Sequence, residues 1–212
     1  NRLFLLKYLN EMKLSKKWNF WKKLIKETKV GNPVRFFLYK SSSGNKIFQT
    51  YHLKKYQENE DIELNNFEVI FEFGGGYGNL AYTFKKINKH CKFIIFDTKE
   101  VNLLQYYYLK KNNLNVNFKN YDSDIDIILL NSLSKLKKQV LKYKNKKKLF
   151  VANWSLSETP LSFRKQIESV MDKFDFQLIS FQHKFEDIDN VKYFKKLNYN
   201  NIKNKRLSKI IP

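Results

Sequence analysis

The chain has 212 residues, of which 42% are hydrophobic and 17% aromatic, with a net charge of +21 and one cysteine. This length and apolar content suit one folded domain and exclude a chain that is disordered throughout. No run of about 18 apolar residues is present, so we expect no membrane-spanning helix, and the lone Cys91 excludes an internal disulfide.

Charge and cysteine usage also bear on location and partners. The first residues lack a signal-peptide pattern, which together with a single cysteine predicts a cytoplasmic protein. The positive charge suggests nucleic acid, but only four of the 41 cations are arginines, the residue favoured for forked contacts with phosphates and bases. Compositional drift also accounts for many lysines, so we interpret the charge as a hint of an acidic substrate and leave nucleic acid as a disfavoured alternative.

Residues 1–60 are predicted to form a helical cap or lid. Apolar residues at helical spacing between Arg2 and Lys29 predict one or two amphipathic helices separated near Ser15. Phe36–Tyr39 and Lys46–Thr50 predict a short hairpin or a lid, and a helix follows from Tyr51. His52 is a candidate general base, with a histidine at the edge of the core as the alternative.

The centre of the chain is a strand, a glycine loop and a helix between Phe67 and Leu80. Val69–Phe73 suits a buried parallel strand and Asn79–Lys89 a helix. Four of the six glycines lie between them, an arrangement that brings a polar ligand close to backbone at a helix N-terminus. A dinucleotide fingerprint needs a third glycine where Asn79 stands, which disfavours an NAD-dependent oxidoreductase.

The loop instead reads acidic-x-G-x-G-x-G, carried by Glu72, Gly74, Gly76 and Gly78. This pattern resembles the first motif of class I S-adenosylmethionine-dependent methyltransferases. The resemblance implies that the three glycines, with Tyr77 among them, pass under the methionine part of the cofactor. It also implies that Glu72 positions the ammonium group of the cofactor.

A second buried strand, Lys92–Phe96, ends in Asp97. An acidic residue about 20 positions past a glycine loop, at a strand tip, can accept two hydrogen bonds from a ribose diol. Thr98 follows it and can cap the next helix. We therefore predict that Asp97 and Thr98 belong to the cofactor site.

Later strand ends supply the remaining candidates. Asn115–Lys119 is a weak strand, Asp124–Leu130 a clear one that Asn131 follows, and Leu149–Ala152 another. Because ligands bind at the carboxyl ends of strands in an open α/β sheet, we place Asn131 in the cofactor site. The polar segment after the last of these strands supplies the predicted substrate contacts and the first candidate for a general base. The alternative role for this candidate base is to stabilise the first turn of a helix. The substrate residues are Asn153, Trp154 and Ser157, and the candidate base is Glu158.

The C-terminal part is predicted to end in an antiparallel hairpin, with strands at Phe176–Gln182 and Val191–Leu197. The predicted organisation is thus a cap at 1–60, a cofactor-binding domain at 61–198 and a basic tail at 199–212. The three histidines lie far apart and no C-x-x-C occurs, so no metal site is predicted.

Three blocks resemble the bacterial putative sugar O-methyltransferases: E-F-G-G-G-Y-G-N from Glu72, F-D-T-K-E followed by L-Q-Y-Y-Y-L, and N-W-S-L-S-E from Asn153. Lys99 stands where that family usually has proline. The resemblance implies an α/β, Rossmann-like sheet of seven strands, mostly parallel with the last antiparallel, and helices on both faces. It implies S-adenosylmethionine as cofactor and, as acceptor, a sugar hydroxyl on a nucleotide-linked or phosphorylated precursor of a surface glycan. An RNA or protein methyltransferase and a non-catalytic interaction protein remain as alternatives.

Overall fold

The computed structural model describes residues 3–118, 126–201 and 206–210, with side chains described up to residue 197. Its helices are α1 (Phe4–Lys13), α2 (Trp18–Ile25), α3 (Gly44–Glu60), α4 (Asn79–Ile87), α5 (Lys99–Lys111), α6 (Leu133–Lys142), α7 (Leu161–Met171) and α8 (Asn190–Asn201), with short 3-10 turns η1 (Leu64–Asn66) and η2 (Ser155–Glu158). Its strands are β1 (Arg35–Phe36), β2 (Tyr39–Ser43), β3 (Val69–Phe73), β4 (Lys92–Phe96), β5 (Val116–Asn117), β6 (Ile127–Leu130), β7 (Lys148–Asn153), β8 (Phe176–Ser180), β9 (Lys184–Phe185), β10 (Ile188–Asp189) and β11 (Arg206–Ile210).

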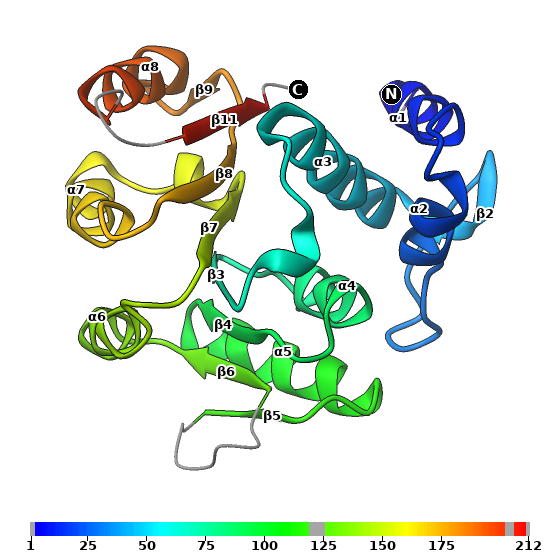
Figure 1. The fold of residues 1–212 in the computed structure, drawn as a ribbon, viewed down its shortest axis with the longest axis horizontal. Helices are drawn as coiled ribbons and strands as arrows, with labels where there is room; N and C mark the ends of the chain where they lie inside the picture. Colours follow the sequence, from blue (N-terminus) through cyan, green and yellow to red (C-terminus); the bar gives the residue numbers. More distant parts are fainter. Residues whose placement is uncertain (1–2, 119–125, 202–205, 211–212) are drawn as a thin grey trace.

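The main sheet has the order β11-β8-β7-β3-β4-β6-β5, and every pairing in it is parallel. The strand that carries the glycine loop, β3, lies between β4 and β7 (Figure 1). From β3 the chain passes first to β4 on one side and later to β7 on the other, so the strand order reverses here. In open α/β sheets ligands bind at this reversal, outside the carboxyl ends of the strands.

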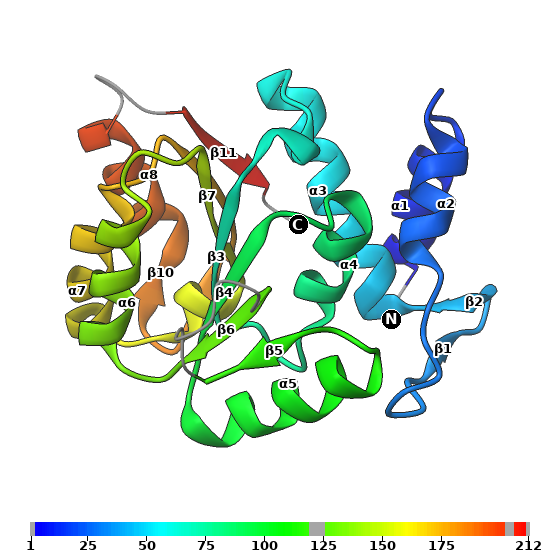
Figure 2. The same ribbon diagram turned by 60° about the horizontal axis from the view of Figure 1, so that its bottom comes forward.

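Alternating side chains divide the interior into two cores. Ile70, Ile95 and Leu129 face the side that α3, α4 and α5 cover, whereas Phe71, Ile94 and Ile128 face α6, α7 and α8. Because successive residues of a strand point to opposite faces, apolar runs such as Val69–Phe73 fill both cores at once. Figure 2 shows the two helical layers on either side of the sheet.

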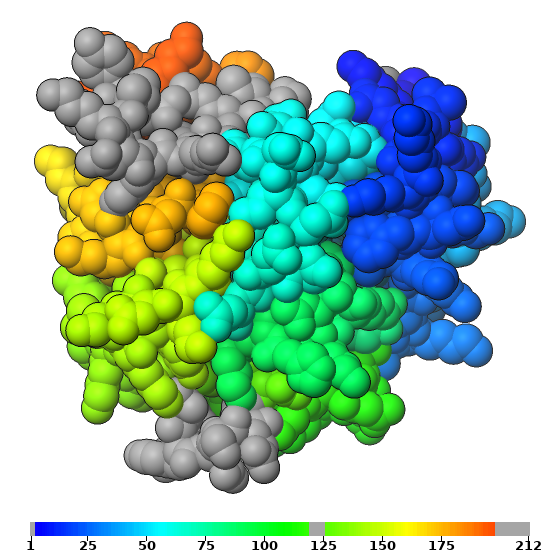
Figure 3. Space-filling model, in the orientation of Figure 1, coloured from blue at the N-terminus to red at the C-terminus, as the bar shows by residue number. Residues whose placement is uncertain are grey.

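The N-terminal helices pack on one end of this α/β unit. Leu9, Trp21 and Ile25 share the core that contains Ile70 and Leu80. Figure 3 shows this segment (blue) beside α3 (cyan). The two predicted helices are confirmed as α1 and α2.

Three sequence predictions need correction. Lys46–Thr50 is helical, because Ser43 accepts a hydrogen bond from the Lys46 amide and starts α3 earlier than Tyr51. Val191–Leu197 lies in α8, where Phe194 and Leu197 are buried on one face, and is not a strand. The edge strand is β11, within the predicted basic tail, and it runs parallel to β8, not antiparallel. Positions 119 and 124–125 of the predicted strands lie outside the described residues.

Candidate functional site

The glycine loop after β3 has a backbone that glycine adopts most readily. Gly74, Gly76 and Gly78 have φ angles of +68°, +54° and +92°. A Cβ on Gly74 would lie 2.2 Å from Cβ of Ser155, so η2 packs directly on the loop. Ser155 also donates a hydrogen bond to the carbonyl oxygen of Phe73. A Cβ on Gly76 would meet nothing within 4 Å, so the loop is open on this side.

Glu72 is the last residue but one of β3, next to this loop, and its carboxyl group is buried and incompletely satisfied. Its Oε2 atom has no hydrogen-bond partner within the described part of the chain. Burial and the nearby charge of Asp97 raise the pKa of Glu72 to about 8. A buried polar atom left without a partner costs free energy, so Glu72 suits a polar or cationic ligand group.

Asp97 and Gln105 tie the second strand to the glycine loop. The Gln105 side-chain amide donates to the carbonyl oxygen of Gly76 and to Oδ2 of Asp97, both at 2.9 Å. The Thr98 amide donates to Oδ1 of Asp97 at 2.9 Å. Burial raises the pKa of Asp97, although hydrogen bonds from Thr98, Gln105 and the glycine loop oppose this rise. Asp97 therefore lies against the glycine loop, as its predicted role requires.

A pocket of about 380 Å³ borders the glycine loop at Tyr77. Its apolar residues are Phe4, Leu5, Pro33, Val34, Phe48 and Trp154. Its remaining residues are Ser43, Gly44, Asn45, Gln49, Tyr77 and Asn153. Thus α1, α3, the glycine loop and the end of β7 all contribute to it, and no lining side chain carries a formal charge at neutral pH.

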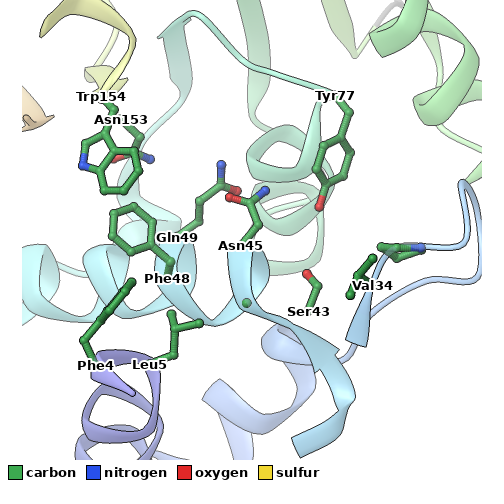
Figure 4. A pocket seen from close by; sticks show the side chains of 12 residues that line it. Phe4, Leu5, Val34, Ser43, Asn45, Phe48, Gln49, Tyr77, Asn153 and Trp154 are labelled. Atoms are coloured by element: carbon green, nitrogen blue, oxygen red, sulfur yellow. The ribbon is translucent and has the colours of Figure 1, made fainter. Parts of the chain in front are cut away.

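The side chains of the pocket form two walls, as Figure 4 shows. Phe4, Phe48 and Trp154 lie on one side, and the ring centroids of Phe48 and Trp154 are 4.8 Å apart. Asn45 and Tyr77 lie on the other, and the Tyr77 hydroxyl points toward Asn45 and Ser43. The Trp154 indole Nε1 has no hydrogen-bond partner among the described residues. A ligand with one apolar face and one polar edge matches these walls.

Behind the polar wall lies a buried carboxylate, Glu27. The Ser43 hydroxyl donates to Oε2 of Glu27 and accepts from the Lys46 amide at 3.2 Å. The Thr28 amide donates to the other carboxylate oxygen at 3.0 Å. A hydroxyl has one donor and two acceptor lone pairs, so Ser43 retains one acceptor position, and the Tyr77 hydroxyl points toward this serine.

The two predicted general bases lie outside the pocket lining. His52 is fully buried one helical turn beyond Phe48, with ring centroids 4.0 Å apart. Burial lowers the pKa of His52 to about 4, and the neighbouring Asn153 opposes this only in part. Glu158 is exposed at the end of η2. The structure therefore brings neither side chain to the pocket.

Some of the other predicted site residues reach the pocket, and others lie away from it. Asn153 and Trp154 reach the pocket, and Tyr77 joins it to the glycine loop. Thr98 caps α5 through Val101, as predicted, and Asn131 is exposed just after β6. Ser157 is fully buried, and its hydroxyl donates to the carbonyl oxygen of Trp154, so it does not reach the pocket.

Several residues of the site had no predicted role. Gln105 stands in the block after Asp97, eight positions on, and this spacing was the available indication of its position. Ser43, Asn45 and Gln49 had no such indication, because the pocket exists only once α3 packs beside the glycine loop. In the described ranges no three His, Cys, Asp or Glu residues gather as metal ligands do. Nor does any helix there have the length and apolarity needed to cross a membrane.

Fold and site together define an α/β protein with a Rossmann-like sheet and a glycine-loop ligand site. No protein-family model matches the sequence, and no curated protein matches it.

Solved structures resemble the fold at low sequence identity. A precorrin-6y C5,15-methyltransferase from Geobacter metallireducens is 8% identical, with 84% of this chain and 80% of that chain covered and a TM-score of 0.49. The mitomycin 7-O-methyltransferase MmcR is 12% identical, with 93% and 60% covered and a TM-score of 0.40. An O-methyltransferase family protein from Burkholderia thailandensis is 10% identical, with 76% and 48% covered and a TM-score of 0.36. Likenesses this distant bear on neither the activity nor the substrate of this chain.

Proposed function

We propose that this protein is an S-adenosylmethionine-dependent methyltransferase that methylates a hydroxyl group of a sugar. The observation that carries the proposal is the position of Tyr77. Its loop holds the features expected of the cofactor site, and its hydroxyl reaches the polar wall of the pocket. The cofactor position and the acceptor position are thus adjacent, at the point beside β3 where the strand order reverses, as transfer of a group between two substrates requires.

The cofactor position fits the residues present. The unpartnered carboxyl oxygen of Glu72 suits an ammonium group, and Asp97 suits a ribose diol at the adjacent strand tip. The open face above Gly76 leaves room for a ligand against the backbone. Gly74 and Gly78 shape the loop, and we assign Tyr77, Thr98 and Asn131 to the same cofactor position. When bound, S-adenosylmethionine supplies an electrophilic methyl group on a sulfonium.

The acceptor position is the pocket itself. Aromatic side chains pack well against the apolar C–H face of a sugar ring, and amides and hydroxyls bind its hydroxyl groups. Trp154 and Phe48 offer the first kind of contact, and Asn45, Gln49 and Asn153 the second. The wall arrangement therefore supports a sugar acceptor, held in line with the loop.

Transfer to a hydroxyl releases its proton, so a base assists the reaction. We assign this role to Glu27 acting through Ser43, because the serine hydroxyl lines the pocket and already donates to the carboxylate. The acceptor proton passes to the Ser43 oxygen as the Ser43 proton passes to Glu27. Glu158 and His52 remain alternative proposals for the base. The division of the chain into a cap, a cofactor-binding domain and a tail is likewise part of the proposal.

Titration calorimetry with S-adenosylmethionine and with NAD tests the cofactor assignment. We expect binding of S-adenosylmethionine alone, weakened about tenfold or more in Asp97→Asn, because the amide replaces one of the two charged acceptor oxygens that face the diol with an NH2 donor. Asp175→Asn is the matched control, since Asp175 is an exposed carboxylate just before β8, and its affinity should stay unchanged. Equal affinity in both variants, or preference for NAD, would contradict the proposal.

The alternative acceptors, RNA or protein, share the cofactor position but require a different acceptor surface. The net charge of +21 favours them, whereas the uncharged pocket favours a small neutral acceptor. Binding of a polynucleotide whose affinity falls steeply with salt would support RNA.

A further inference from the structure

The pocket is uncharged in a strongly basic chain. The sequence has 41 Lys and Arg residues, yet none of those that the structure describes lines the pocket. Its polar groups are amides and hydroxyls, which leave the charge of a phosphate unpaired. Transfer of an unpaired charge out of water is costly, so the phosphate of a nucleotide-linked sugar gains no compensating contact from this lining.

The pocket also opens onto an apolar mouth. Two of its lining residues are largely solvent-exposed, Phe4 at 44% and Val34 at 79%. Leu3, which precedes Phe4, is 57% exposed. The apolar wall formed by Leu5, Phe48 and Trp154 therefore continues outward through the exposed Phe4, and the exposed Val34 lies across the pocket from it (Figure 4). Exposed apolar surface continuous with a binding pocket marks a place where a ligand buries an apolar part.

We infer that the acceptor is an uncharged glycoside with an apolar aglycone, its sugar between the two walls and its aglycone over Phe4 and Val34. This inference rests on the proposed function for the sugar itself, and goes beyond it in the identity of the remainder of the acceptor. It replaces the nucleotide or phosphate expected from sequence with an apolar group. The two side chains at the mouth then select the aglycone while the inner amides select the sugar.

The test compares n-octyl β-D-glucopyranoside with methyl β-D-glucopyranoside, each titrated calorimetrically below its micellar concentration into the full chain saturated with S-adenosylhomocysteine. Burial of only a few methylene groups makes the octyl glucoside bind about tenfold or more tightly. UDP-glucose serves as the nucleotide-linked probe and should bind no better than the methyl glucoside. Val34→Asn should reduce the octyl-to-methyl affinity ratio about threefold or more, as expected for lost apolar contact.

Phe4→Asn is a second variant at the other side of the mouth and should reduce the same ratio. Leu104→Asn is the matched control, because Leu104 is a 52% exposed leucine on α5 outside the pocket lining, and the ratio should not change. Equal affinities for the two glucosides, no binding of either, tighter binding of UDP-glucose, or a ratio unaffected in both mouth variants would each overturn the inference. Absence of S-adenosylhomocysteine binding would instead overturn the proposed cofactor. Titrations of the two glucosides into the protein without S-adenosylhomocysteine would still test whether the mouth of the pocket prefers an apolar aglycone.

Discussion

At the scale of single residues, Glu72 links ligand binding to pH. Its pKa of about 8 means that the carboxyl group is mostly protonated at pH 6.5 in the free protein. A cationic ammonium placed beside it favours the carboxylate, so binding should release a proton. Below pH 8 the affinity for S-adenosylmethionine should therefore rise with pH.

Calorimetry at pH 6.5 in buffers of different ionisation enthalpy measures this release. We expect close to one proton per cofactor bound, and none in Glu72→Gln, which has no titratable group at that position. A release that is unchanged in the variant would mean that another group carries the proton. No release in the wild-type protein would mean that Glu72 does not face the ammonium.

At the scale of elements, Arg164 fixes the turn that supports Trp154. This fully buried side chain of α7 donates to the carbonyl oxygens of Ser157 and Thr159, at 2.6 and 2.8 Å, and to the Asn190 side chain at 2.7 Å. Its guanidinium also lies 4.9 Å from the centroid of the Tyr193 ring. One arginine thus joins η2 to α8.

Arg164→Met should lower the free energy of unfolding by about 3 kcal/mol or more, because three acceptors lose a hydrogen bond from a buried guanidinium, and only the Ser157 carbonyl oxygen keeps another donor among the described residues, the Asn190 side chain. Lys165→Met, at the exposed neighbouring position of the same helix, should change it by less than about 0.5 kcal/mol. Urea denaturation of the two variants gives both values. Equal stabilities would show that water or relaxation satisfies the freed carbonyl groups.

Elements were predictable where one local pattern decides the outcome. The apolar runs of β3, β4 and β7 can only be buried strands, and Gly74–Gly78 can only be a tight loop. Val191–Leu197 suggests a strand because Val191, Tyr193 and Leu197 lie at even spacing, but the buried Phe194 and Leu197, three residues apart, share a face only in a helix, and Phe194 packs on Phe181. The pocket was beyond prediction, since Tyr77 is far in sequence from Ser43 and Gln49 and meets them only after α3 packs on α4.

At the scale of the whole molecule, Lys46 joins the N-terminal region to α4, the helix that follows the glycine loop. From α3 its fully buried amine donates to the side-chain oxygens of Asn79 at 2.8 Å and Thr83 at 3.1 Å, both on α4. Burial lowers the pKa of Lys46 from 10.5 to about 7, and the charge of Glu27 opposes this only in part. Above pH 7 the helices therefore meet around a mostly neutral amine.

Because this pKa is lower in the folded state, the unfolded chain binds more protons between pH 7 and 10.5. The contribution of Lys46 to stability is therefore full above pH 10.5 and lost as the pH falls through about 7. Raising the pH also reduces the self-repulsion of a chain of charge +21, and it does so almost equally in a single-site variant. The difference in unfolding free energy between wild type and Lys46→Met isolates the lysine.

We expect that difference to shift in favour of the wild type by on the order of 1 kcal/mol per pH unit from pH 7.5 to 9.5. Urea denaturation at several pH values measures it, with Lys138→Met, which removes an exposed lysine from α6, as the control. In the control the difference should stay nearly constant, because the buried Lys46 amine is retained. A constant difference in Lys46→Met as well would mean that the amine keeps its charge within the fold, and that α3 and α4 are joined by an ionised lysine.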